Sequence, residues 1–194
     1  LMNGIPMRMG TVDNDGYNAF ALSRNKEAVE AFWVQLKVVE QSSKGIRTKD
    51  MPSEWFAVPS DAAMKNSMVA TRGVFACNRL MDEERFEEAD TLMNHLLEID
   101  SGIVGLHRNL LICDRIYVEL IRKSRCEVIE SMMTAEQKQF MKTMKRFPSV
   151  LRTQYTIALL FENDTVKAET IKNEFEKVAK TYPYPQDIES ERDF

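Results

Sequence analysis

The sequence has 194 residues, of which 44% are hydrophobic and 29% charged, with a formal net charge of −4 and a pI near 5.4. This length suits one globular domain or two small ones that share a core. The mild net acidity provides no electrostatic attraction for a polyanion, so nucleic acid is not an expected partner. Seven glycines and six prolines are too few for the turns of a many-stranded sandwich or barrel, which favours helices.

The chain is predicted to divide into four segments. These are an irregular arm at residues 1 to 22, a helix with an aromatic linker at 23 to 59, a helical-repeat domain at 60 to 181 and an acidic irregular tail at 182 to 194. In the second segment Ala28, Phe32, Leu36 and Val39 recur at helical intervals, and Ser23 or Asn25 could cap that helix.

Periodic apolar residues predict a series of helices with short connections. The expected ranges are residues 26–41, 61–81, 86–98, 104–123, 135–146, 149–161 and 165–181. Thr134 and Gln137 have the spacing of a capping box, and Pro148 separates the helix before it from the helix after it. The predicted fold is therefore all-α, built from antiparallel helical hairpins.

One hairpin resembles a tetratricopeptide repeat. Phe86, Ala89, Met93 and Leu96 follow the pattern of the second helix of that repeat, with the small residue Ala89 on the packing face. The first helix of the hairpin would contribute Gly73 and Cys77 as its small contacts. The resemblance covers about one repeat, and it implies a tetratricopeptide-like, right-handed stack of hairpins.

Three cysteines, Cys77, Cys113 and Cys126, occur without a CxxC spacing. An odd number of widely spaced cysteines predicts neither a disulfide framework nor a zinc knuckle, and reduced thiols in a cytosolic compartment are the simple interpretation. No stretch contains the roughly 18 to 20 apolar residues needed to cross a bilayer, so the chain itself is expected to be soluble.

The N-terminal arm resembles part of a known family. Asn3 and Pro6 precede the run Asn14-Asp15-Gly16, and further matches are the segments Ala31 to Lys37 and Lys49 to Phe56. Together they are similar to the region after the last catalytic membrane segments of bacterial site-2 proteases, which are membrane-embedded zinc metallopeptidases. In that family an aspartate followed by glycine provides the third zinc ligand, and a His-Glu-x-x-His helix provides the other two.

The resemblance implies that Asp15 is a zinc ligand, and only within a longer parent protein. No His-Glu-x-x-His occurs here, and His95 and His107 are too far apart to lie one turn apart on a helix. A hydrolytic zinc needs three protein ligands, so this chain alone is predicted to hold no zinc and to have no catalytic residue. Leu1 would then be an internal residue of a membrane protein, and the helices would lie on the cytoplasmic side of the membrane.

Alternative interpretations exist for these residues. Asp13, Asn14, Asp15 and Gly16 also suit a solvated turn, because Asx residues and glycine favour turns irrespective of any metal. A calcium loop is excluded, since Thr11 and Leu22 stand where two acidic ligands should be. His95, His107 and Cys113 are expected to have ordinary packing or surface roles.

Two functions follow as hypotheses. The first is a regulatory or interaction domain attached to the membrane catalytic domain of a site-2-type zinc protease, where it would recruit or gate substrates. The second is a free-standing helical-repeat adaptor that binds a peptide and has no protease activity. Eight methionines suggest an adaptable peptide-binding surface, since thioether side chains repack around varied partners, although methionines at helical spacing more often fill a core. They are Met64, Met68, Met81, Met93, Met132, Met133, Met141 and Met144.

Overall fold

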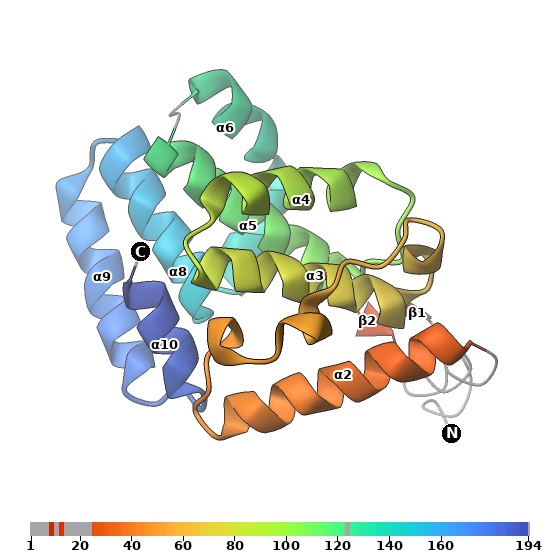
Figure 1. The fold of residues 1–194 in the computed structure, drawn as a ribbon. Coiled ribbons are helices and arrows are strands. Elements are labelled where there is room, and N and C mark those ends of the chain that lie inside the picture. Colours follow the sequence, from red (N-terminus) through yellow and green to blue (C-terminus); the bar gives the residue numbers. More distant parts are fainter. Residues whose placement is uncertain (1–7, 10–11, 14–24, 123–124, 194) are drawn as a thin grey trace. The chain divides into compact units, whose positions relative to one another are not determined.

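The computed structural model describes residues 8–9, 12–13, 25–122 and 125–193. The prediction of an all-α fold is confirmed: apart from one pair of two-residue strands, β1 (Arg8–Met9) and β2 (Val12–Asp13), the regular elements in these ranges are helices (Figure 1). The strands are antiparallel, with Arg8 opposite Asp13. The chain comprises two compact units, residues 1–108 and 109–194, and their boundary falls inside the range predicted as one helical-repeat domain.

Within the described residues, the first unit contains three complete helices, and a series of short 3₁₀ turns connects the first of these helices to the second. In order these are α2 (Lys26–Ser43), the 3₁₀ turns η1 (Thr48–Asp50), η2 (Ser53–Phe56) and η3 (Ala63–Lys65), and the helices α3 (Ser67–Asp82) and α4 (Phe86–Glu98). Asn25 caps α2, because its side-chain oxygen accepts from the backbone N–H groups of Glu27 and Ala28. Asn66 caps α3 in the same way through Met68 and Val69.

Of the apolar residues by which the sequence predicts α2, only Ala28 is buried. The buried residues are Ala28, Ala31, Val34 and Val38, whereas Leu36 and Val39 are each about half exposed. The helix therefore has two apolar series at helical spacing, and only one of them is buried. Along the outer side α2 therefore presents Val29, Trp33, Leu36 and Val39 to solvent.

The aromatic linker after α2 packs on that helix. Phe56 and Met51 are buried with Val34 and Val38 in one cluster, and the rings of Trp33 and Trp55 meet edge to face at 6.1 Å. These contacts fix the linker against α2.

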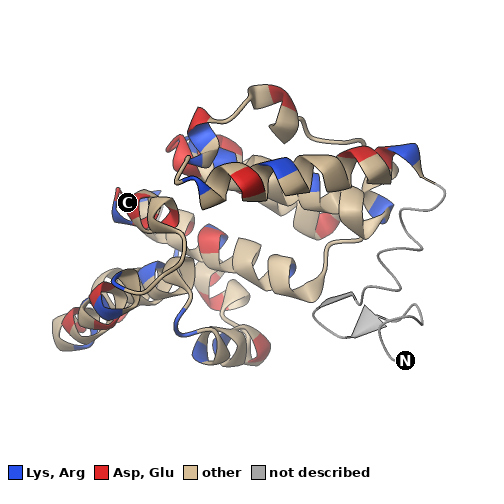
Figure 2. Ribbon diagram, turned by 90° about the horizontal axis from the view of Figure 1, so that it is seen from below, with Lys and Arg blue, Asp and Glu red and all other residues tan. Residues whose placement is uncertain are grey.

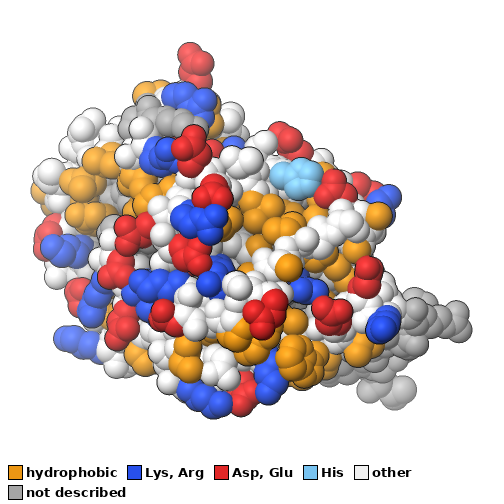
Figure 3. All heavy atoms as spheres, in the orientation of Figure 1, with side chains coloured by type: hydrophobic (Ala, Val, Ile, Leu, Met, Phe, Trp, Pro, Cys, Tyr) orange, Lys and Arg blue, Asp and Glu red, His pale blue; other side chains and the backbone are white. Residues whose placement is uncertain are grey.

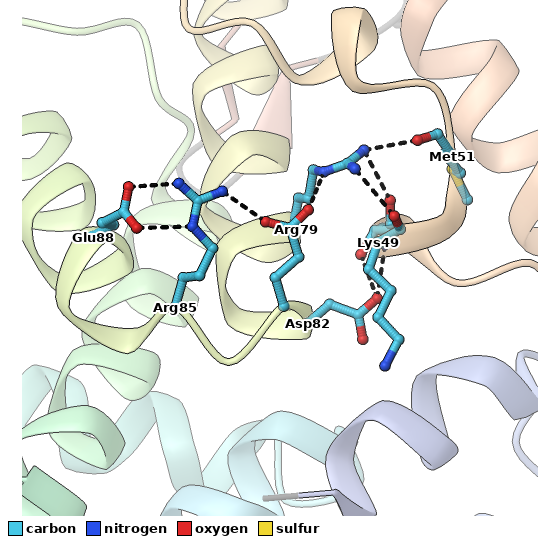
Figure 4. A network of polar contacts seen from close by, with 8 residues as sticks. Lys49, Met51, Arg79, Asp82, Arg85 and Glu88 are labelled. Carbon is cyan, nitrogen blue, oxygen red and sulfur yellow. Dashed lines mark hydrogen bonds and ion pairs between the residues drawn. The ribbon is translucent and has the colours of Figure 1, made fainter.

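Arg79 and Asp82 on α3 also bind the backbone of this linker (Figure 4). Arg79 donates to the backbone carbonyls of Lys49 at 3.0 Å and Met51 at 2.8 Å. Asp82 accepts from the backbone N–H of Lys49 at 2.9 Å. Arg85, at the end of the same network, pairs with Glu83 and Glu88. Since these charges pair with one another, the network is a structural clamp.

Small residues allow α3 and α4 to approach closely. Ala89 and Cys77 are fully buried, and a Cβ added to Gly73 would lie 3.1 Å from the Leu96 side chain. These are the small contacts expected from the tetratricopeptide resemblance at this hairpin. The right-handed stack of such hairpins along the whole chain stays a prediction.

The second unit includes most of the long helix α5 and the helices after it. These are α5 (Gly105–Arg122), α6 (Cys126–Met132), α7 (Ala135–Thr143), α8 (Pro148–Thr156), the π segment η4 (Ile157–Phe161), α9 (Thr165–Ala179) and α10 (Pro185–Arg192). Its core is apolar: Cys113, Ile116, Leu120, Ile129, Met141, Val150 and Ile157 are buried together.

The predicted capping box is half formed. Thr134 accepts from the backbone N–H of Gln137 at 3.1 Å and so caps α7. The Gln137 side chain does not return to Thr134, because it turns into the core and donates to the carbonyl of Asn109 and the Cys113 sulfur.

The tail from 182 to 194 was predicted to be irregular, and this is wrong for Pro185–Arg192, which forms α10. Pro185 occupies the first turn, where its missing N–H removes no helical hydrogen bond, so it starts the helix instead of breaking it. Gln186 and Ile188 are buried, which ties α10 to its unit.

Candidate functional site

A groove with a volume of about 370 Å³ lies in the second unit among α5, the α8–η4 segment, α9 and α10. This volume is within the usual range of ligand-binding cavities. Its apolar lining residues are Tyr117, Ile121, Leu151, Tyr155, Leu159, Leu160 and Phe175. Its polar lining residues are Arg152, Thr156, Lys172, Glu176, Glu191 and Arg192. We refer to it as the Tyr117 groove.

Large apolar side chains in the groove are exposed to water. Ile121 on α5 is 38% exposed and Leu160 on the π segment 48% exposed. Hydrophobic side chains gather on the surface over α8 and α9 (Figure 3). A cavity that places such side chains on two different elements is suited to cover apolar groups of a ligand.

A π segment shapes one wall of the groove. The backbone N–H of Glu162 donates to the carbonyl of Ile157, five residues earlier, at 2.9 Å. The segment ends at Phe161, and Asn163, between it and α9, has a φ of 55°. A π turn accommodates one more residue than an α turn, which rotates the following side chains and is frequent at functional sites. Leu159 and Leu160 lie in this segment and line the groove.

Arg152 lies at the polar end of the groove and is almost fully buried. Its guanidinium carbon is 4.2 Å from the centre of the Tyr117 ring. One terminal nitrogen bonds Asp114, and the other lies 2.8 Å from a carboxylate oxygen of Glu191 on α10. Stacking on an aromatic face and pairing with carboxylates are both typical of arginine. The guanidinium on α8 is thus oriented by contacts from two other elements, α5 and α10.

Burial affects the acidic groups beside Arg152. It raises the pKa of Asp114 above the usual range, although the neighbouring Arg152 cation opposes this shift. Burial also raises the pKa of the adjacent Cys113 thiol, to about 12. This thiol is therefore protonated at neutral pH and is not a nucleophile.

The rim of the groove carries an uneven set of charges. Arg192 pairs with Glu176 at 2.7 Å, and both side chains are about half exposed. Within the described residues no ion pair involves Lys172, which is exposed on α9. Elsewhere the two signs of charge are interspersed over the helices (Figure 2). Lys172 consequently gives this rim a local positive charge.

The described residues that the sequence singled out as site candidates do not line the Tyr117 groove. Asp15 lies outside the described residues. His95 pairs with Asp61 at 2.9 Å on the surface of the first unit. His107 is largely buried, which lowers its pKa. Cys113 contacts Gln137 in the core of the second unit. His95 thus lies on the surface of the first unit and Cys113 in the core of the second.

Among the residues that the structure describes, no three His, Cys, Asp or Glu side chains lie together as a metal site would require. No helix in the described ranges combines the length and apolar character needed to span a bilayer.

No known protein family, curated protein or solved structure matches this chain. The function is therefore inferred from the geometry of the groove and from the sequence.

Proposed function

We propose that this chain is a helical interaction domain that binds an amphipathic helical segment of a partner protein in the Tyr117 groove. The observation that carries the proposal is the exposure of Leu160 and Ile121 on two walls of one open cavity. A partner that covered these side chains would remove apolar surface from water, which is the main driving force of such association.

A helix suits this site better than an extended strand. The lining elements are helical, so they present no open sheet edge for a strand to pair with. An amphipathic helix places apolar side chains at every third or fourth position, and several of them can enter one groove together. Lys172 at the rim can pair with a carboxylate on the polar side of such a helix.

The proposal is tested with a display library of short amphipathic peptides selected on the full chain. The affinity of the selected peptides is measured by fluorescence anisotropy for the unchanged chain and for two variants. Leu160→Glu places a charge in the groove and should weaken binding about tenfold or more. Val166→Glu is the matched control, because Val166 is 78% exposed on α9 and does not line the groove. Equal affinities for both variants would contradict the proposal.

We also propose that this interaction domain belongs to a site-2-type zinc protease. The support is the sequence of the arm, where Asp15 and Gly16 match the ligand motif of that family. Among the described residues no group of side chains could hold zinc, so the remaining ligands would come from another part of a longer protein. In that setting the groove would recruit or gate substrates; without a protease, the chain would act as an adaptor.

A further inference from the structure

Helix α10 packs beside the Tyr117 groove and contributes to its lining through Glu191 and Arg192. The helix is short, from Pro185 to Arg192, and acidic, with Asp187, Glu189 and Glu191. Its side chain Ile188 is buried, while Glu189 points into solvent. The molecule thus already holds, at this place, one short acidic helix with a single buried isoleucine.

Helix α10 depends on its contacts with the rest of the second unit, because an eight-residue helix is not stable by itself in water. The side-chain amide of Gln186 is buried, and neither its oxygen nor its nitrogen has a hydrogen-bond partner among the described residues, which costs free energy. The Arg192–Glu176 pair is exposed and contributes little. The buried Ile188 side chain and the ion pair of Glu191 with Arg152 are two contacts that hold the helix and can be removed by substitution.

Arg152 would remain a well-formed carboxylate site after α10 left. Asp114 on α5 would still hold one terminal nitrogen, and the Tyr117 ring would still cover one face of the guanidinium. The other terminal nitrogen, which now pairs with Glu191, would face the opened surface. Arginine stays protonated, so this edge of the guanidinium would favour a new carboxylate in the place of Glu191.

We infer that the partner segment is an acidic amphipathic helix whose carboxylate replaces Glu191 on Arg152, and that α10 covers this docking face until the partner displaces it. The inference rests on the proposed function and adds the chemistry of the partner to it. The partner helix then has an apolar anchor in the place of Ile188, a carboxylate in the place of Glu191, and further apolar residues that reach Leu160 in the groove.

The test uses a fluorescent peptide with the sequence of residues 182–194 as a stand-in for the partner. It is titrated against the full chain, against the full-length variant I188A/E191Q, and against the single variant E191Q. In the unchanged chain the tethered α10 competes at high effective concentration. We expect the double variant to bind the peptide about tenfold more tightly than the unchanged chain does, since the competitor is weakened. Circular dichroism checks that both variants stay folded. If I188A/E191Q does not fold, the same comparison is made with the single variant E191Q.

Two altered peptides test the role of the carboxylate. A peptide carrying E191Q should bind the double variant about tenfold more weakly, as expected for the loss of one charge-assisted pair. A peptide carrying E189Q has the same change in charge at an exposed position and should bind as the unaltered peptide does. Equal affinity for all proteins, no binding to any, or equal losses with both peptides would overturn the inference. The proposed function is judged separately, by the effect of Leu160→Glu on the library peptides.

Discussion

Asp82 near the end of α3 holds Arg47, which precedes the first 3₁₀ turn of the linker. The two nitrogens Nε and Nη2 of Arg47 donate to one carboxylate oxygen of Asp82 at 3.0 and 2.6 Å. The other oxygen accepts from the Thr48 hydroxyl at 3.0 Å and the backbone N–H of Lys49 at 2.9 Å. One buried carboxylate therefore satisfies four donors from a segment more than thirty residues away.

Asp82→Ala should destabilise the first unit by about 3–5 kcal/mol, because it leaves the largely buried Arg47 cation without its carboxylate. The free energy of unfolding is measured in urea. The control is Glu88→Ala, which removes a half-exposed partner of Arg85 and should cost less than about 1 kcal/mol. Replacing both partners, as R47M/D82L, should recover part of the loss; no recovery would show that the hydrogen bonds to the turn dominate.

Gly102→Ala should destabilise the chain by about 1–3 kcal/mol through overpacking. An added Cβ would lie 2.6 Å from the Lys65 carbonyl oxygen and 2.8 Å from the Ser67 nitrogen, and both belong to the backbone. Gly45→Ala offers a comparison, because Gly45 has a φ of 80° but no atom within 4 Å of the added Cβ. It should cost only the left-handed strain of about 1–2 kcal/mol. Thermal unfolding measures both losses, and a Gly102 variant as stable as the parent would contradict the packing described.

Stability should fall at alkaline pH because of Cys113. Burial raises the pKa of its thiol from 9.0 to about 12 in the folded chain. Between these values the folded state keeps the proton and the unfolded state loses it, so rising pH favours unfolding. The slope contributed by this thiol approaches about 1.4 kcal/mol per pH unit. Urea unfolding across this range should give a shallower pH dependence for Cys113→Ala; identical slopes for both proteins would refute the assignment.

One thiol should react rapidly with Ellman's reagent in the native chain. Cys126 is exposed, whereas Cys77 and Cys113 are buried. The fast phase should disappear in Cys126→Ser, and all three thiols should react once the chain is unfolded. A second fast thiol in the native state would mean that one of the two cores opens readily.

Asp15 provides the test of the family resemblance. If a longer protein contains this chain after a His-Glu-x-x-His membrane segment, Asp15→Ala should abolish peptide cleavage and leave the helices folded, because the zinc loses one of three ligands. Asp15→Asn should also be almost inactive, since a neutral amide binds a dication less well than a carboxylate. Full proteolysis with Asp15→Ala would leave the adaptor as the better hypothesis.

Local sequence patterns predicted the helices well but not the surfaces that those helices bury. Helix α9, from Thr165 to Ala179, could be predicted because Asp164 caps it and its apolar residues recur at helical intervals. On α2, two sets of apolar residues have helical spacing, so the periodicity alone could not decide between Val38 and Val39 as the buried position. That choice depends on the shape of α3 and the linker.

The Tyr117 groove could not be found in the same way. Its residues come from positions 117 to 192, so only the tertiary fold brings them together. In the sequence, Tyr117 and Ile121 have the same helical spacing as apolar residues that face a core, so their spacing does not indicate a groove. Helix α10 was not predicted, because two prolines near its start and many acidic residues suggested an irregular tail. In the structure the buried Ile188 and the ion pair of Glu191 with Arg152 hold this helix.

The π segment has a consequence for how this surface could arise or be lost in evolution. Its wide turn holds one residue beyond what an α-helix needs, so deletion of a single codon within Ile157–Phe161 would let α8 continue as an ordinary helix. The side chains after the deletion would turn by about 100° around the helix axis, and Leu160 would leave the groove wall. A one-residue length difference at this point would therefore separate homologues that bind a helix here from homologues that do not, even where the apolar residues themselves are the same.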